Sequence, residues 1–251
     1  MARKRKQGAD PVKQLTVVFD YGGVMSEGFD PIPSIHREVG GDLDAVRDAY
    51  WGARKQYDAG ALTLDQYWAG VCAAAGIADP SADEALALQD ADNHYWGVLA
   101  RGSRELLHDL ARNGVRLVLL SNTSKAFGEY LREQEWFEAF AFALISAEEG
   151  VVKPEREIFE IVLDSVAHET GGVSRPGNVI FFDDVRENVE AAQALGIDAH
   201  LWPRNGDAAS NGEDPYTHAH ADGGRNEDEQ TSAPGWELAR TILTERGLPL
   251  D

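Results

Sequence analysis

The 251-residue sequence contains one cysteine, Cys72, and no apolar run of the ~18 residues needed to cross a bilayer. A single cysteine excludes an internal disulfide, which fits a reducing compartment. The basic N-terminal segment MARKRKQGADP is not followed by the apolar stretch of an export signal. We therefore expect a cytoplasmic protein with no membrane partner.

Basic residues are also scarce: 23 Lys and Arg stand against 43 Asp and Glu, which gives a formal net charge of −20. A nucleic-acid partner needs clustered basic side chains, so we expect none. The cluster RKRK lies in residues 1–13, which we interpret as a disordered basic tail. Residues 205–235 hold seven acids, one arginine and few aliphatic residues, and we interpret them as an acidic low-complexity insertion.

Short apolar runs alternate with helical patterns along most of the chain. This alternation predicts an α/β fold, with a mainly parallel, Rossmann-like sheet that carries helices on both faces. We expect strands at residues 15–19, 115–121, 142–146, 179–182 and 199–202, and helices over 103–114, 155–169 and 186–196.

Residues 27–97 have helical periodicity and no good strand, and they are too long for a loop inside a compact domain. We expect a helical domain inserted into a core made of residues 14–26 and 98–204. Residues 236–251 should add a C-terminal helix that packs on this core. Five aromatic residues of the insertion are expected to form its own core and its contact with the sheet: Trp51, Tyr67, Trp68, Tyr95 and Trp96.

Polar residues follow the predicted strands, at the edge of the sheet where α/β proteins bind ligands. They are Asp20 after the first strand, Ser121-Asn122 after the second, Lys153 before a helix, and Asp183-Asp184 after VIFF. Each has a structural alternative, because Asp, Asn and Ser also cap turns and helices. Together, two acids from separate strands could bind a hard cation such as Mg²⁺, while a hydroxyl and a lysine could hold phosphoryl oxygens.

The segments FDYGGV, LLSNTS, VVKPEREIF and FFDDVRENVEAA resemble, in this order, the four motifs of the haloacid dehalogenase superfamily. The resemblance covers about residues 14–203, including a helical cap inserted after the first motif. Within the superfamily the chain looks most similar to the bacterial sugar-phosphate phosphatases, the group that includes α-D-glucose-1-phosphate phosphatase. The resemblance implies a Mg²⁺-dependent phosphatase of a small phosphorylated metabolite, acting through an aspartyl phosphate.

The resemblance also implies roles for individual residues. Asp20 would be the nucleophile and a metal ligand, together with the backbone carbonyl of Gly22. Lys153 would steady the nucleophile and the phosphoryl group. Asp184 aligns with the metal-binding aspartate of the superfamily. Four further residues complete the implied site: Ser121 and Asn122 would bind the phosphoryl group, and Asp183 and Asn188 would support the metal ligands from behind.

One position departs from the superfamily pattern, because most of its phosphatases carry an acid where this chain has Gly22. That acid serves as the general acid and base for the leaving group, a contribution of about 10²–10⁴-fold. We therefore expect a good leaving group, such as that of an anomeric sugar phosphate, or a proton supplied by water or another residue.

Two alternatives remain open at this point. A 2-haloacid dehalogenase would use the same aspartate without metal, but these enzymes carry Tyr two residues after the nucleophile, whereas Tyr21 is one residue after Asp20. A catalytically impaired binding protein would explain the missing acid. The sequence indicates neither the oligomeric state nor the substrate.

Overall fold

The computed structural model describes residues 15–26, 30–172, 175–203, 235–248 and 250. The predicted basic tail and all of the predicted acidic insertion except Gly235 lie outside the described residues. Within the described part of the chain, no helix is long and apolar enough to cross a membrane.

Five parallel strands form the sheet, in the order β3-β2-β1-β4-β5. Their apolar residues favour extended, buried backbone. The strand expected at residues 142–146 ends one residue earlier, because Ser146 starts a short helix. The strands are β1 (Thr16–Phe19), β2 (Arg116–Ser121), β3 (Phe142–Ile145), β4 (Val179–Asp183) and β5 (Asp198–Leu201).

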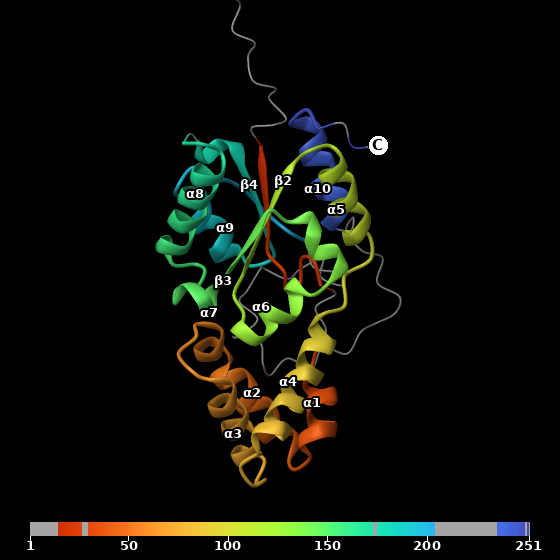
Figure 1. The fold of residues 1–251 in the computed structure, drawn as a ribbon, viewed down its shortest axis with the longest axis vertical. Helices are drawn as coiled ribbons and strands as arrows, with labels where there is room; N and C mark the ends of the chain where they lie inside the picture. The colour runs from red at the N-terminus through yellow and green to blue at the C-terminus, as the bar shows by residue number, and fades with distance from the viewer. Residues whose placement is uncertain (1–14, 27–29, 173–174, 204–234, 249, 251) are drawn as a thin grey trace, which may run out of the picture.

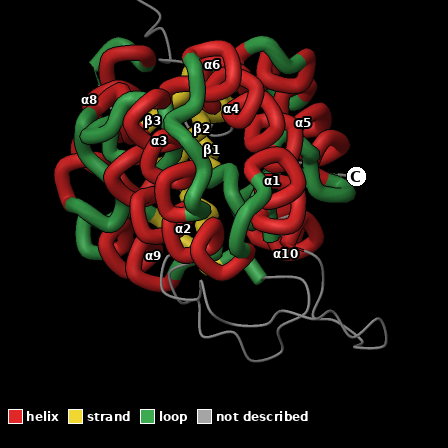
Figure 2. Tube along the Cα trace, turned by 90° about the horizontal axis from the view of Figure 1, so that it is seen from below, coloured by secondary structure: helices red, strands yellow, loops and turns green. Residues whose placement is uncertain are grey.

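Helices cover both faces of the sheet, as predicted (Figure 2). One face packs against α5 (Ser103–Arg112), α6 (Lys125–Arg132) and α10 (Gly235–Glu245), with Phe19, Leu106 and Leu243 in a single apolar cluster. The other face packs against α8 (Arg156–Glu169) and α9 (Arg186–Gln193), where Val18 meets Phe159. Adjacent residues Val18 and Phe19 thus serve opposite faces, as the two-residue period of a strand requires. Short elements complete the core: η2 (Glu135–Ala139), α7 (Ser146–Glu149) and η3 (Pro176–Asn178).

A helical cap lies at one end of the molecule, beyond the carboxyl ends of the strands (Figure 1). Thr63 and Ser81 start the third and fourth helices with reciprocal capping boxes, which satisfy amide groups that the helix itself leaves unbonded. The cap has its own core, in which Tyr67 and Trp68 are fully buried, whereas Trp96 packs against the sheet domain. The four helices are α1 (Ile32–Val39), α2 (Leu43–Asp58), α3 (Leu64–Ala74) and α4 (Ala82–Trp96).

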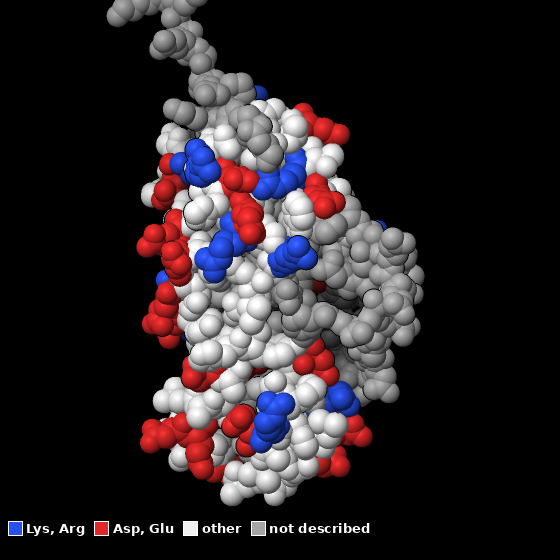
Figure 3. Space-filling model, turned by 90° about the vertical axis from the view of Figure 1, so that its right-hand side faces the viewer, with Lys and Arg blue, Asp and Glu red and all other residues white. Residues whose placement is uncertain are grey.

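Acidic and basic side chains both lie on the described surface (Figure 3). On the face drawn in Figure 3, the described basic side chains are interspersed with acidic ones rather than gathered into one broad patch. The absence of a nucleic-acid partner stays a prediction.

Candidate active site

Asp20 is the first residue after β1, at the carboxyl edge of the sheet. Its backbone N–H donates to the carbonyl oxygen of Phe182 on β4, at 2.9 Å, which fixes the chain as it leaves the strand. The side chain is buried, with Oδ1 2.7 Å from the ammonium nitrogen of Lys153. Burial raises the pKa of Asp20, Lys153 lowers it, and the carboxylates of Asp183 and Asp184 raise it further.

Lys153 lies in the loop before α8, and its side chain is only 1% exposed. Its Nζ donates to Asp183 Oδ2 at 2.6 Å, in addition to its contact with Asp20. Burial would lower the pKa of Lys153, but the two carboxylates outweigh that effect and raise the pKa. The residue therefore carries a fixed positive charge in the site.

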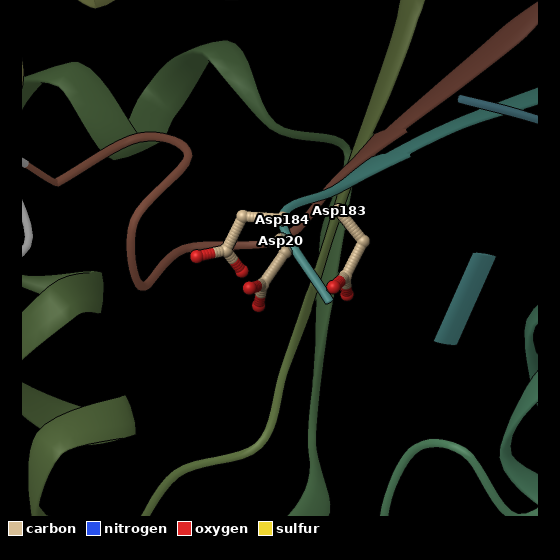
Figure 4. Close-up of side chains that lie close together, drawn as sticks. All are labelled: Asp20, Asp183 and Asp184. Carbon is tan, nitrogen blue, oxygen red and sulfur yellow. The ribbon is translucent and has the colours of Figure 1, made fainter. Parts of the chain in front are cut away.

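Asp183 and Asp184 follow one another at the end of β4 but have different surroundings. Both oxygens of Asp183 are occupied: Oδ1 accepts from the Val185 N–H at 2.8 Å, Oδ2 binds Lys153, and Asn188 Nδ2 lies 3.0 and 3.1 Å from the two oxygens. Asp184 instead extends toward the loop after β1, as Figure 4 shows beside Asp20. Asn188 thus lies against Asp183, and the support of the metal ligands by these two residues stays a prediction.

The two glycines after Asp20 have different structural requirements. Gly23 has φ of +70°, and a Cβ there would lie 2.2 Å from Asp184 Oδ2, so any other residue would strain the backbone and displace that carboxylate. Gly22 has no left-handed backbone, and a Cβ there would meet no atom within 4 Å. The fold therefore favours glycine at position 23 and has room for a side chain at position 22.

Ser121 and Asn122 end the neighbouring strand β2 and begin the loop after it. Ser121 is buried. The Asn122 side chain forms two hydrogen bonds with the backbone of Lys153: Nδ2 donates to its carbonyl oxygen at 2.9 Å, and Oδ1 accepts from its N–H at 2.8 Å. The amide thus positions the lysine loop, and binding of a phosphoryl group by Asn122 stays a prediction.

Carboxylate oxygens of Asp20, Asp183 and Asp184 all lie within 4.8 Å of one another, and all three residues are buried. When ionised, these three acids and Lys153 carry two excess negative charges. One divalent cation would balance this charge, and carboxylate oxygens are the ligands that hard cations prefer. The residues therefore fit a site for such an ion.

The sequence interpretation missed Thr123 and Ser146. The N–H of Thr123 donates to Ser146 Oγ at 2.9 Å, and that hydroxyl in turn contacts the cap. In the sequence, Ser146 is recognisable only as the residue after the apolar run FALI, and the expected strand at residues 142–146 includes it.

A parallel α/β sheet with clustered acids at its carboxyl edge and a helical cap after the first strand defines a class of hydrolase folds. The profile of the haloacid dehalogenase-like hydrolase family matches residues 15–196, and the chain belongs to this family. The sesquiterpene phosphatase astK of Aspergillus oryzae is 29% identical over 187 residues, which cover 72% of this chain and 85% of that protein.

Solved structures share the fold at lower identity. An L-2-haloacid dehalogenase from Xanthobacter autotrophicus matches 91% of this chain and 98% of its own, with a TM-score of 0.61 and 17% identity. A HAD family enzyme from Bacteroides thetaiotaomicron, solved in complex with magnesium and inorganic phosphate, matches 78% of this chain and 97% of its own. Its TM-score is 0.55 and its identity 22%.

Proposed function

We propose that the protein is a Mg²⁺-dependent phosphatase that transfers the phosphoryl group of a small metabolite to Asp20 and then to water. One observation carries the proposal: Asp20 lies in a buried cluster that joins two further carboxylates and one lysine. Phosphoryl transfer needs little besides positioning and charge neutralisation, and this cluster is suited to both.

Asp20, Asp184 and the carbonyl of Gly22 would hold the ion. Asp183 is a weaker candidate, because its oxygens already accept from Lys153, Asn188 and the Val185 N–H. When bound, Mg²⁺ would neutralise the excess charge of the acids and allow a phosphoryl group to approach Asp20. Lys153, already 2.7 Å from Asp20, would hold the nucleophile in its ionised form and contact the incoming phosphoryl oxygens.

In the proposed reaction an oxygen of Asp20 attacks phosphorus, and the bond from phosphorus to the leaving oxygen breaks. Water then attacks the phosphorus of the aspartyl phosphate, which releases inorganic phosphate and restores Asp20. One water molecule is consumed overall. The leaving group gains a proton, and the oxygen of the water becomes part of the inorganic phosphate. Ser121 at the end of β2 would bind the phosphoryl group through its hydroxyl.

The leaving group is constrained by Gly22. No side chain at this position donates a proton, although the backbone has room for one. A leaving group of low basicity departs without strong acid catalysis, and an anomeric sugar phosphate meets this condition better than a simple alkyl phosphate. We therefore propose a sugar phosphate as the substrate. A terpenyl phosphate should be tested beside it, because the Aspergillus relative is named a sesquiterpene phosphatase.

The test is phosphate release from an aryl phosphate, a panel of anomeric and non-anomeric sugar phosphates, and farnesyl phosphate, together with halide release from a 2-haloacid. Each is assayed with Mg²⁺ and with chelator, beside Asp20→Asn. Release that needs both the metal and Asp20 supports the proposal, and the ranking of the panel tests the substrate class. Metal-independent release of halide from a 2-haloacid would favour the dehalogenase instead, and absence of any turnover would favour a binding protein.

A further inference from the structure

The cap meets the core at the chain crossings, where α4 packs on α6, and where α2 packs on α7. On one side lie the chain crossings, where Ser26 pairs with Leu99 and the Ala100 N–H donates to the Met25 carbonyl at 2.7 Å. On the other side, the end of α2 contacts α7. Figure 1 shows α7 above α2 at the left of the molecule and the connection from α4 to α5 at the right. The contact of α2 with α7 is therefore one of the contacts on which closure of the cap depends.

The hydroxyl of Ser146 bridges this contact between α2 and the core. Ser146 Oγ donates to the carbonyl oxygen of Asp58, the last residue of α2, at 2.5 Å, and accepts from the Thr123 N–H at 2.9 Å. Ser146 is completely buried. The Thr123 carbonyl oxygen lies 3.3 Å away as a second acceptor. The hydroxyl therefore keeps a partner in the core when the cap moves away, so opening does not leave a buried donor unsatisfied.

On the cap side of the contact, the end of α2 is held by side-chain hydrogen bonds and lies close to the core. Arg54 Nε donates to both carboxylate oxygens of Asp58, at 3.1 and 3.2 Å, which fixes the last turn of α2. Two residues later Gly60 has φ of +74°, and a Cβ there would lie 2.5 Å from the carbonyl oxygen of Ala147. Glycine at this position permits the close approach of cap and core.

The core side leads directly to the candidate active site. Thr123 follows Asn122, whose amide holds the Lys153 backbone through two hydrogen bonds. Lys153 Nζ in turn lies 2.7 Å from Asp20. A shift of Thr123 would therefore also shift Lys153 and change its contact with Asp20.

We propose that Ser146 is a positioning residue that couples cap closure to the loop of residues 121–123. Its hydroxyl favours the closed cap through Asp58 and fixes the loop through Thr123. The effect on turnover rests on the proposed function, since it assumes that this loop binds a phosphoryl group. The effect on cap closure does not.

The experiment compares Ser146→Ala and Gly60→Ala with two matched controls. Ser103→Ala removes another buried hydroxyl, one that has no hydrogen-bond partner among the described residues. Gly76→Ala imposes the same strain as Gly60→Ala, since its φ is +76°, but its Cβ would meet no atom within 4 Å. Amide hydrogen exchange is measured over residues 57–61 and 146–150, with urea unfolding as the measure of global stability, and kcat/KM is measured for an aryl phosphate.

We expect Ser146→Ala to speed exchange in both segments and to lower kcat/KM about two- to tenfold, the effect of one lost hydrogen bond. Gly60→Ala should change both quantities in the same direction, and adding Ser146→Ala to it should have little further effect. Both controls should stay within about twofold of wild type.

Wild-type exchange in residues 57–61 of Ser146→Ala would overturn the coupling, even if kcat/KM falls, because the serine would then act only within the core. Faster exchange with unchanged kcat/KM would also overturn it. If the wild-type protein hydrolyses no aryl phosphate, the proposed function fails, while the exchange measurement still tests the contact itself.

Discussion

Replacing Asp183 and Asp184 separately by asparagine should affect different properties of the protein, although the two residues are adjacent. Asp183 is fully buried and accepts from Lys153, Asn188 and the Val185 N–H. Asparagine would keep one acceptor oxygen but turn an NH₂ group toward Lys153 or Asn188. Breaking a buried ion pair costs about 3–5 kcal/mol, and Lys153 retains Asp20 as a partner, so we expect a loss of about 2–3 kcal/mol.

Asp184→Asn should behave differently. The negative charge of Asp184 is one of the causes that raise the pKa of Asp20, so neutralising it relieves repulsion in the metal-free protein. In chelator we therefore expect Asp184→Asn to lose less stability than Asp183→Asn. In Mg²⁺ at one hundred times its Kd, the wild-type protein should gain about 2.7 kcal/mol, and Asp184→Asn should lose most of this gain.

The assay is urea unfolding of the three proteins in chelator and in Mg²⁺, with Mg²⁺ affinity from calorimetry. Asp183→Asn should be destabilised in both conditions and keep most of its response to the metal. Equal responses of the two variants to Mg²⁺ would refute the division of roles, as would a larger loss of stability in chelator for Asp184→Asn than for Asp183→Asn.

Three further substitutions test the site. Asp20→Asn should abolish phosphate release and leave the circular dichroism spectrum unchanged, and surviving activity would exclude Asp20 as the nucleophile. Gly22→Asp should raise kcat/KM for alkyl phosphates by about 10²-fold or more while changing activated aryl phosphates little, and Gly22→Asn is the control that fills the same space without an acid. Equal gains for both variants would argue against proton donation. Gly23→Ala should lower the free energy of unfolding in urea by about 1–3 kcal/mol, because residue 23 has a positive φ and its new Cβ would meet Asp184. Gly22→Ala should change the free energy of unfolding by less than ~1 kcal/mol.

The sheet and its helices could be predicted because their signals are local. Val18 and Phe19 belong to a short apolar run, and helix starts such as Thr63 have capping residues that are visible in the sequence. Boundaries were less certain, since Ser146 continues an apolar run and yet begins a helix. Backbone hydrogen bonding in three dimensions decides such positions.

The side-chain partners within the site could not be predicted in the same way. Asp183 and Asp184 differ by one residue in sequence, but only the turn after β4 decides which of them binds Lys153. The two bonds between Asn122 and Lys153 join positions 31 residues apart, and Ser146 meets Asp58 across 88 residues. Such contacts depend on how separate elements pack, and neither composition nor periodicity records that packing.

The central claim is that Asp20 attacks phosphorus and that water displaces it in a second step. The most direct measurement is the stereochemical course at phosphorus. The substrate is an aryl phosphorothioate whose phosphorus is chiral because it carries sulfur and different oxygen isotopes, and the configuration of the product is compared with that of the substrate. Two successive in-line displacements predict net retention of configuration at phosphorus. Inversion would show a single direct attack by water and would contradict the assignment of Asp20 as the nucleophile.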